Sequence, residues 1–283
     1  MKTTTTNELY NKVEKIQLST LLSALIPPKG KEYVIVDSSS KAMLSFCSKE
    51  YQLRKNSVIY KEFEKALDKK YVKFKKETII IDRTKFYVNY IILSPIESVH
   101  IMDLLPVVTI WNSYDGTIKT QIHFGYRKLL CSNNLSRPTT CDFKTSSKHS
   151  SFDEEFTKYS IPHFMEMCMS FLKCIKKDIK VFEKINAIPA TKKILDNISS
   201  KLKLHANARD LAIAQHQKEM DGNYTYLNYK GEQVLHKGGK MTMFSIYNAI
   251  NYAIYHMNNK ELPEKKYKRN DLLMDLVLKI SLK

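Results

Sequence analysis

Basic and aromatic side chains alternate along two stretches of the sequence that read as β-hairpins. The stretch at residues 71–93 begins with Tyr71 and carries the basic residues Lys73, Lys75, Arg83 and Lys85. The polar side of the stretch at residues 117–128 carries Lys119, Gln121 and His123, and the stretch ends in Tyr126, Arg127 and Lys128. Basic groups hold phosphates and aromatic rings stack on unpaired bases, so this pattern favours binding of single-stranded nucleic acid. An ordinary solvated sheet surface is the structural alternative.

The segment Asn-Ser-Tyr-Asp-Gly at residues 112–116 has residue types that could hold a ligand or a metal ion. Asn112 and Asp115 are also the residue types that hydrogen-bond to their own backbone in turns, and Gly116 supplies the positive φ angle that hairpin turns need. The structural interpretation is therefore favoured.

A cysteine nucleophile would need a base and an orienting amide beside it. Cys131, His123 and Asn133 supply these residue types. Cys131 follows two leucines, however, and this pattern is more typical of a small core residue.

Other catalytic classes lack their motifs. The sequence has no G-x-x-x-x-G-K-[ST] and no G-x-G-x-x-G, so nothing indicates nucleotide hydrolysis or a dinucleotide cofactor. The eight histidines are scattered singly, and the acidic run at residues 153–155 suits a helix N-terminus. We therefore expect no cofactor and no metal site, and a binding protein rather than an enzyme.

The charge balance also indicates an anionic partner. The chain has 46 Lys and Arg against 29 Asp and Glu, a net charge of +17. Such an excess favours polyanion binding and says nothing about fold.

The five cysteines lack C-x-x-C spacing, which indicates reduced thiols. Apolar runs are too short to span a bilayer and no secretion signal begins the chain, so we expect a cytoplasmic protein without membrane contact.

The elements that position these residues come from hydrophobic spacing. Residues 107–111 read as a buried strand ending in Trp111, and residues 117–126 as its return strand. The return strand has one inner face, made of Ile118, Thr120, Ile122 and Phe124. We expect helices at residues 8–26 and 57–69, the second capped by Ser57, and a short strand at residues 33–36.

The second half of the chain reads as helical. Helices are expected at residues 162–186, 191–204, 206–220, 242–257 and 271–282, with a short-stranded insert at 222–239 and a basic loop at 262–270. The fold class is therefore α+β, with an antiparallel sheet of two hairpins flanked by helices and a mainly helical C-terminal half. We expect a helix-plus-sheet core at residues 1–135, a linker at 136–151 and a helical region at 152–283 that packs back on the sheet.

Three blocks carry a resemblance to a known family. They are NSYDGT at residues 112–117, GYRKLLCSNNL at 125–135, and TMFSIYNA at 242–249 with His256 beyond it. In this order they resemble the signatures N-S-H-D-G-S, F-R-x-x-C-x-N-x-L and T-x-W-x-x-x-N-A of a domain-of-unknown-function family found in phages, plasmids and their bacterial hosts. The resemblance runs from about residue 51 to 256. It implies motif roles for Asn112, Asp115, Gly116, Cys131, Asn133, Asn248 and His256.

The resemblance assigns no chemistry. Tyr114 stands where the family usually has His, Phe244 replaces Trp and Asn134 replaces Gly. The first departure argues against a general acid–base role at position 114.

The resulting hypothesis is a single-stranded DNA binding or annealing protein of a phage or plasmid, acting in recombination or replication without nucleotide hydrolysis. The order of elements is similar in outline to the ring-forming single-strand annealing proteins, which would imply a homo-oligomer. Two alternatives stay open. One is a protein-interaction component of a mobile element, anti-defence or structural. The other is a hydrolase or nuclease with an unrecognised site near Asn112, Asp115 and His256.

Three structural expectations follow. Trp111 should be buried in a strand, with Asp115 and Gly116 in the hairpin turn. Asn248 should make a buried side-chain hydrogen bond on a helix whose inner face is Phe244, Tyr247, Ile250 and Ile254. Arg127 should pair with a carboxylate, Asp115 or Asp103, with phosphate binding by its guanidinium as the alternative. Lys119 and Lys128 should face the ligand.

Overall fold

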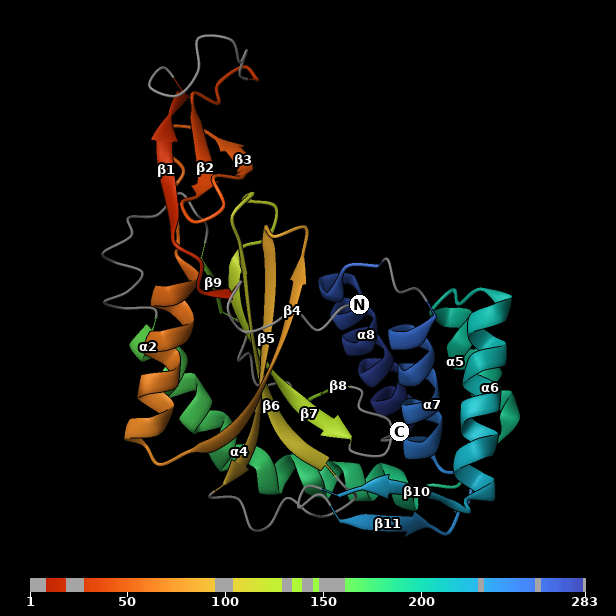
Figure 1. The fold of residues 1–283 in the computed structure, drawn as a ribbon. Coiled ribbons are helices and arrows are strands. Elements are labelled where there is room, and N and C mark those ends of the chain that lie inside the picture. The colour runs from red at the N-terminus through yellow and green to blue at the C-terminus, as the bar shows by residue number, and fades with distance from the viewer. Residues whose placement is uncertain are drawn as a thin grey trace. The chain divides into compact units, whose positions relative to one another are not determined.

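The computed structural model describes residues 9–18, 28–94, 104–128, 134–138, 145–147, 161–228, 232–257 and 261–281 (Figure 1). The fold is α+β, as expected, with antiparallel sheets in the N-terminal half and a mainly helical C-terminal half. The chain divides into two compact units. The first unit comprises Met1–Pro95, Val108–His123 and Phe143–Phe171, and the second comprises Ile96–Val107, Phe124–Asp142 and Leu172–Lys283. The expected linker lies mostly outside the described residues, so the division at residues 135 and 152 stays a prediction.

The first unit begins with a three-stranded antiparallel sheet of β1 (Val13–Gln17), β2 (Tyr33–Asp37) and β3 (Met43–Cys47). The helix expected across residues 8–26 is therefore wrong at 13–17, and residues 19–27 lie outside the described part. The backbone of β1 pairs with β2 along its whole length, and the Lys15 ammonium donates to the carbonyl oxygens of Lys49 and Tyr51, both at 2.7 Å. This pairing overrides the local helical spacing.

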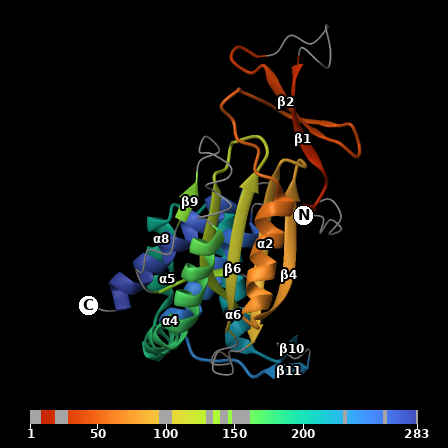
Figure 2. The ribbon, with the colours of Figure 1, turned by 90° about the vertical axis from the view of Figure 1, so that its left-hand side faces the viewer.

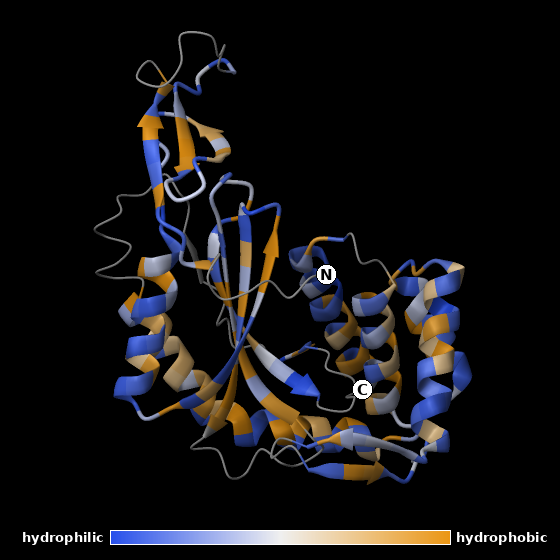
Figure 3. Cartoon of the chain, in the orientation of Figure 1, coloured by the Kyte–Doolittle hydropathy of each residue, from blue (hydrophilic) through white to orange (hydrophobic). Residues whose placement is uncertain are grey.

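Helix α2 (Asn56–Lys69) has the expected two faces. Ile59, Phe63 and Leu67 are buried, whereas the outer face of lysines is exposed. Hydrophilic and hydrophobic bands alternate along this helix in Figure 3. The prediction that Ser57 caps this helix is wrong. The N-cap residue is Lys55, and its side chain makes no capping hydrogen bond.

Helix α2 lies against the hairpin of β4 (Lys73–Ile81) and β5 (Lys85–Ser94), as Figure 2 shows. The Phe63 ring packs on the Tyr90 ring at a centroid distance of 5.1 Å. The hairpin expected at residues 71–93 is thus confirmed. Its turn holds Asp82 and Arg83 at φ angles of 51° and 55°.

The main sheet has six strands in the order β4-β5-β6-β7-β8, with β9 also pairing with β7. The further strands are β6 (Leu104–Ser113), β7 (Thr120–Lys128), β8 (Asn134–Ser136) and β9 (Thr145–Ser147). Every residue of β6 is buried, and Trp111 is 3% exposed, which confirms its expected place. The return strand begins at Thr120 rather than at residue 117, because the Ser113 hydroxyl binds both backbone groups of Ile118 and holds residues 114–119 as a loop.

The second unit contains α5 (Lys192–Lys201), α6 (Ala206–Asp221), α7 (Met243–His256) and α8 (Pro263–Ser281), and α4 (Ile161–Ala187) enters it from the first unit. A two-stranded ribbon, β10 (Tyr224–Leu227) and β11 (Gln233–His236), connects α6 to α7. Helix α7 packs against both α6 and α8. No helix in the described part of the chain is long and apolar enough to cross a bilayer.

The basic loop expected at residues 262–270 is wrong, because α8 already begins at Pro263. Proline is well tolerated in the first turn of a helix. Lys266 is buried and its ammonium donates to the Tyr255 carbonyl at 2.7 Å, while Asn270 is fully buried. Lys266 and Asn270 are thus buried within α8, although the basic composition of residues 262–270 indicated a solvated loop.

Candidate nucleic-acid interface

The Asn112 amide organises the base of the loop at residues 114–119. Its Nδ2 donates to the Arg54 carbonyl at 2.9 Å and to Asn56 Oδ1 at 2.8 Å, and its Oδ1 accepts from the Thr120 hydroxyl at 2.9 Å. The side chain is fully buried. An amide with these three partners is a structural group, so the geometry favours the structural interpretation of Asn112.

The next residues of the same loop clamp the β4–β5 turn. The Tyr114 backbone N–H donates to the Thr84 carbonyl at 2.7 Å, and the Asp115 carboxylate pairs with the Lys85 ammonium at 2.6 Å. Asp115 also accepts from the backbone N–H and the hydroxyl of Thr117. Burial acts to raise the pKa of Asp115, but the hydrogen bonds from Lys85 and Thr117 outweigh it and lower that pKa. The ionised carboxylate therefore locks one turn against the other.

Gly116 lies in this loop, as expected, with a φ of 70°. A Cβ atom there would lie 3.0 Å from the Tyr51 ring, whose hydroxyl donates to the Ser113 carbonyl at 3.1 Å. Both the backbone angle and the close ring favour glycine.

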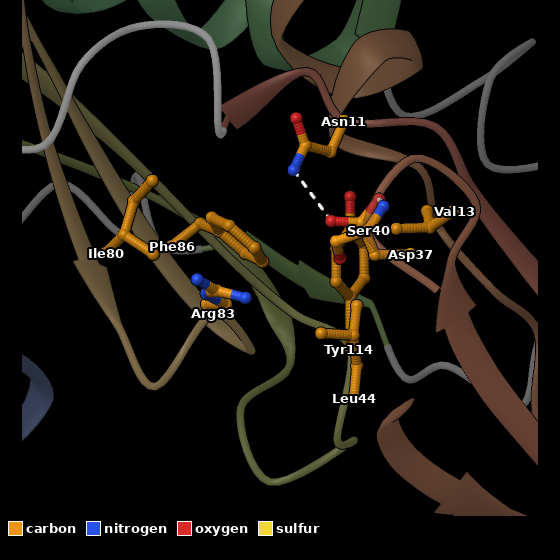
Figure 4. A pocket seen from close by; sticks show the side chains of 9 residues that line it. All are labelled: Asn11, Val13, Asp37, Ser40, Leu44, Ile80, Arg83, Phe86 and Tyr114. Carbon is orange, nitrogen blue, oxygen red and sulfur yellow. Dashed lines mark hydrogen bonds between the residues drawn. The ribbon is translucent and has the colours of Figure 1, made fainter. Parts of the chain in front are cut away.

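The loop and the turn form part of the wall of a pocket in the first unit, shown in Figure 4. Its volume is about 200 Å³. The β4–β5 hairpin contributes Arg83 and Phe86, the three-stranded sheet contributes Asp37, and the loop contributes Tyr114. The Tyr114 ring meets the Phe86 ring edge-on at 4.8 Å, which gives the pocket an aromatic wall.

Only some of the expected nucleic-acid contacts lie on an open surface. Lys73, Arg83 and Lys119 are exposed, and their side chains have no hydrogen-bond or ion-pair partner among the described residues. Lys75 is exposed beside Glu77, 3.6 Å away, whereas Lys85 is engaged by Asp115. His123 is half-buried and stacks on the Trp111 ring at 4.0 Å.

Two of the expected contacts lie inside the second unit. Tyr126 is fully buried and donates to the Asp178 carboxylate at 2.7 Å, and Arg137 pairs with the same carboxylate at 2.7 Å. Lys128 is buried with its ammonium 3.3 Å from Glu219 Oε2 and 5.2 Å from the centre of the Phe244 ring. Burial leaves neither side chain a face for a ligand, so the surface we consider below does not include them.

Arg127 is half-buried at the end of β7. Its Nε donates to Asn134 Oδ1 at 3.0 Å. The expected pairing of Arg127 with Asp115 is wrong, because Asp115 binds Lys85 instead, and Asp103 lies outside the described residues. Cys131 and Asn133 also lie outside them.

The block at residues 242–256 builds the core of the second unit. Phe244, Tyr247, Ile250 and Ile254 are all buried, as expected. Asn248 is fully buried and its Nδ2 donates to Glu219 Oε1, which confirms the predicted side-chain hydrogen bond. His256 is exposed at the end of α7 and stacks on Tyr252 at 4.2 Å.

The three blocks at residues 112–117, 125–135 and 242–249 all lie within one region of the sequence that matches a family model. A model described as a domain of unknown function (DUF932) matches residues 43–274. The chain belongs to the DUF932 family. No curated protein and no solved structure shows a significant match to it. The DUF932 region starts at β3, so the pocket wall that carries Asp37 precedes it in the sequence.

Tyr71, at the start of the stretch of alternating basic and aromatic residues, is almost fully exposed to solvent. Tyr71 is 88% exposed in the connection between α2 and β4, with a φ of 55°. Lys69 and Lys70 before it and Lys73 after it are also exposed. The run Lys-Lys-Tyr-x-Lys was visible in the sequence, but its exposure and backbone angle were not.

Proposed function

We propose that this DUF932 protein binds single-stranded DNA, without nucleotide hydrolysis, and supports annealing during recombination or replication. The observation that carries the proposal is the Tyr71 ring, presented to solvent between three lysines. Aromatic rings in a basic setting are how proteins hold single strands without reading their sequence.

The left-handed backbone of Tyr71 ends helix α2, because it lets the Val72 N–H donate to the Leu67 carbonyl at 3.1 Å, but folding gives no reason for an exposed aromatic ring at this position. The Tyr71 N–H donates to the Asp68 carbonyl, so Tyr71 follows the end of α2 in the left-handed region, where glycine or asparagine is usual. A bulky residue with positive φ is uncommon and strained. A ring that is 88% exposed contributes little to the core, so a ligand is the better reason for placing it there.

The surrounding charges suit a phosphate backbone. The ammonium groups of Lys69, Lys70 and Lys73 have no hydrogen-bond or ion-pair partner among the described residues. Lysines beside an edge strand such as β4 also discourage strand-to-strand aggregation. That alternative accounts for the lysines and leaves Tyr71 unexplained.

The test is fluorescence anisotropy with a labelled single-stranded oligonucleotide at two salt concentrations, about 50 and 200 mM. Tyr71→Ala should weaken binding about 5- to 150-fold, the effect of losing one stacked base at about 1–3 kcal/mol. Tyr71→Phe keeps the ring and should retain the affinity. Unchanged affinity of a folded Tyr71→Ala variant would sink the proposal.

A charge test complements the ring test. The triple variant Lys69→Ala, Lys70→Ala, Lys73→Ala should flatten the salt dependence by up to about 2 logarithmic units, at about 0.7 per phosphate contact. The matched control removes three exposed lysines from α4, Lys173, Lys176 and Lys177, and should leave the slope unchanged. A loss confined to the control would place the binding surface on α4 instead.

Two further parts of the proposal, a role in a mobile element and action in the host cytoplasm, rest on the resemblance to phage and plasmid proteins. Assembly as a homo-oligomer rests on the similarity in outline to the ring-forming single-strand annealing proteins. Sedimentation with and without single-stranded DNA tests the assembly.

A second candidate is a protein-interaction component. Leu227 and Leu235 are 59% and 52% exposed on the β10–β11 ribbon, where alternation places them on one face. Exposed apolar side chains gathered on one face favour a protein partner. Binding through that face would depend weakly on salt, whereas phosphate binding weakens steeply.

A further inference from the structure

The pocket of the first unit combines groups that a nucleotide would need. Figure 4 shows two facing walls, with Arg83 and Phe86 on one side and Asp37 and Tyr114 on the other. The volume of about 200 Å³ exceeds the roughly 150 Å³ of an engineered cavity that binds benzene, so one planar ring fits.

Arg83 is free to bind an anion. Its guanidinium has no hydrogen-bond or ion-pair partner among the described residues, and it reaches toward the pocket beside the Phe86 ring. A guanidinium binds phosphate with two parallel hydrogen bonds.

The backbone of Arg83 adds independent support. Its φ is 55° at the second central position of a hairpin turn, where glycine is strongly preferred. The left-handed conformation is unfavourable for a residue with a Cβ atom. Because the loop at residues 114–119 clamps this turn through Thr84 and Lys85, the strained conformation is held in place before any ligand arrives.

Asp37 offers an acceptor on the opposite wall. The side chain is 3% exposed, and its Oδ1 accepts from the backbone N–H groups of Ser39 and Ser40. Its Oδ2 accepts from Asn11 at 2.8 Å and retains room for another donor. Burial acts to raise the pKa of Asp37, but these hydrogen bonds outweigh it and lower that pKa, so the group is an ionised acceptor at neutral pH.

We propose that the pocket binds one nucleotide whose base carries an amino group. The base lies in the pocket against the Phe86 and Tyr114 rings, which come from the two facing walls and meet edge-on. Its amino group donates to Asp37, and its phosphate binds the exposed Arg83. Adenine, cytosine and guanine supply the amino group and thymine does not. The inference rests on the proposed function, since a strand held at Tyr71 supplies the nucleotide at the other end of β4.

Glycine substitution in the turn separates binding from folding. Arg83→Gly removes the guanidinium and relieves the positive φ, so its melting temperature should equal or exceed that of the parent protein. Its affinity for single-stranded oligo-dC should fall roughly tenfold, as expected for the loss of charge-assisted hydrogen bonds. Asp82→Gly is the matched control, because Asp82 shares the turn and the positive φ but does not line the pocket. It should keep the affinity.

The preference for one base over another tests whether Asp37 accepts a hydrogen bond from the base. The parent protein should bind oligo-dC more tightly than oligo-dT, and Asp37→Asn should bring the ratio of the two affinities toward one. If Asp37→Asn does not fold, the preference of Arg83→Gly for oligo-dC should still be smaller than that of the parent. Free deoxycytidine and thymidine monophosphates, measured by calorimetry, show whether the source is a free nucleotide or a base of a strand.

Equal affinities of the parent, Arg83→Gly and Asp82→Gly for both oligonucleotides and monophosphates would overturn the pocket. That result together with a loss in Tyr71→Ala would leave the proposed function standing. If oligonucleotides do not bind at all, the proposed function fails, and the monophosphates alone decide the pocket.

Discussion

Asn112 and Asn248 are both fully buried amides in the DUF932 region, but their surroundings differ in charge. Asn112 in the first unit binds a carbonyl, an amide and a hydroxyl, all neutral. Asn248 in the second unit binds Glu219, whose carboxylate also accepts from Lys128 and Gln215. The neutral network ends at a surface loop, and the charged network closes on itself between β7, α6 and α7.

This difference indicates that the two networks have different roles. The neutral network positions the loop that clamps the β4–β5 turn, and thereby Arg83, so its loss should affect ligand binding as well as stability. The side chains of the charged network, Lys128, Glu219 and Asn248, are buried, so we expect its loss to affect stability alone. A buried ion pair is sensitive to the removal of one partner, because the other charge is then left uncompensated.

Glu219→Ala should have the largest effect. Lys128 would keep its charge in the core without a carboxylate, and the free energy of unfolding should fall by about 3–5 kcal/mol. Urea denaturation followed by circular dichroism measures this loss. Oligonucleotide affinity of the folded fraction should stay unchanged.

The paired variant Glu219→Gln, Lys128→Met is the control for this prediction. Removing both charges should restore most of the stability. If Lys128→Met alone weakened DNA binding while the protein stayed as stable as its parent, Lys128 would be a phosphate ligand and the comparison between the two networks would fail.

Asn112→Ala should come next. The change removes two donated hydrogen bonds and one accepted bond from a fully buried site, so the free energy of unfolding should fall by about 2–3 kcal/mol. Thr120→Val removes only one of these bonds and should show a smaller loss. Oligonucleotide affinity should fall for Asn112→Ala as well, and an affinity equal to that of the parent would separate the loop from the binding site.

The sequence predicted elements whose pattern is local. The alternation along β7 placed Thr120 and Ile122 inside, and the helical spacing of residues 244–254 placed the face of α7. The same alternation puts Tyr126 and Lys128 on the inner side of β7. A buried position was not expected for Lys128, because lysine is rarely buried unless it is paired. Its partner Glu219 is 91 residues away, and no local pattern contains that information.

Long-range contacts also explain the elements that the sequence missed. The β1 strand depends on pairing with residues 33–37, and the start of α8 depends on a hydrogen bond from Lys266 to the end of α7. The pocket joins residues from positions 11 to 114, so its volume follows from tertiary packing alone.

Asp115→Asn should have a moderate effect that depends on pH. The change removes a charged partner of Lys85, and hydrogen bonds to charged groups contribute about 1.5–3 kcal/mol, less here because the site is partly open to water. The folded pKa of Asp115 lies below the ordinary value, so its contribution is present above about pH 3.9 and is lost as the pH falls through the folded pKa. The stability difference between parent and variant should therefore be larger at neutral pH than in acid. A difference independent of pH would show that the carboxylate does not clamp the turn.

The smallest effects concern the helix starts beside the two networks. Helix α7 has a capping box in which Ser245 N–H donates to the Thr242 hydroxyl at 3.1 Å and Thr242 N–H donates to the Ser245 hydroxyl at 2.9 Å. Helix α2 has Lys55 at the same position, with no side-chain cap and a positive charge at the positive end of the helix dipole. Lys55→Asp should therefore raise the free energy of unfolding by about 0.5–1 kcal/mol, while Thr242→Ala should lower it by about 1 kcal/mol. Thermal melts of both variants measure the two signs. Lys55 lies at the opposite end of α2 from Tyr71, so the oligonucleotide affinity of Lys55→Asp should equal that of the parent protein. A loss of stability would mean that Lys55 has a role at the start of α2 beyond its place in the backbone.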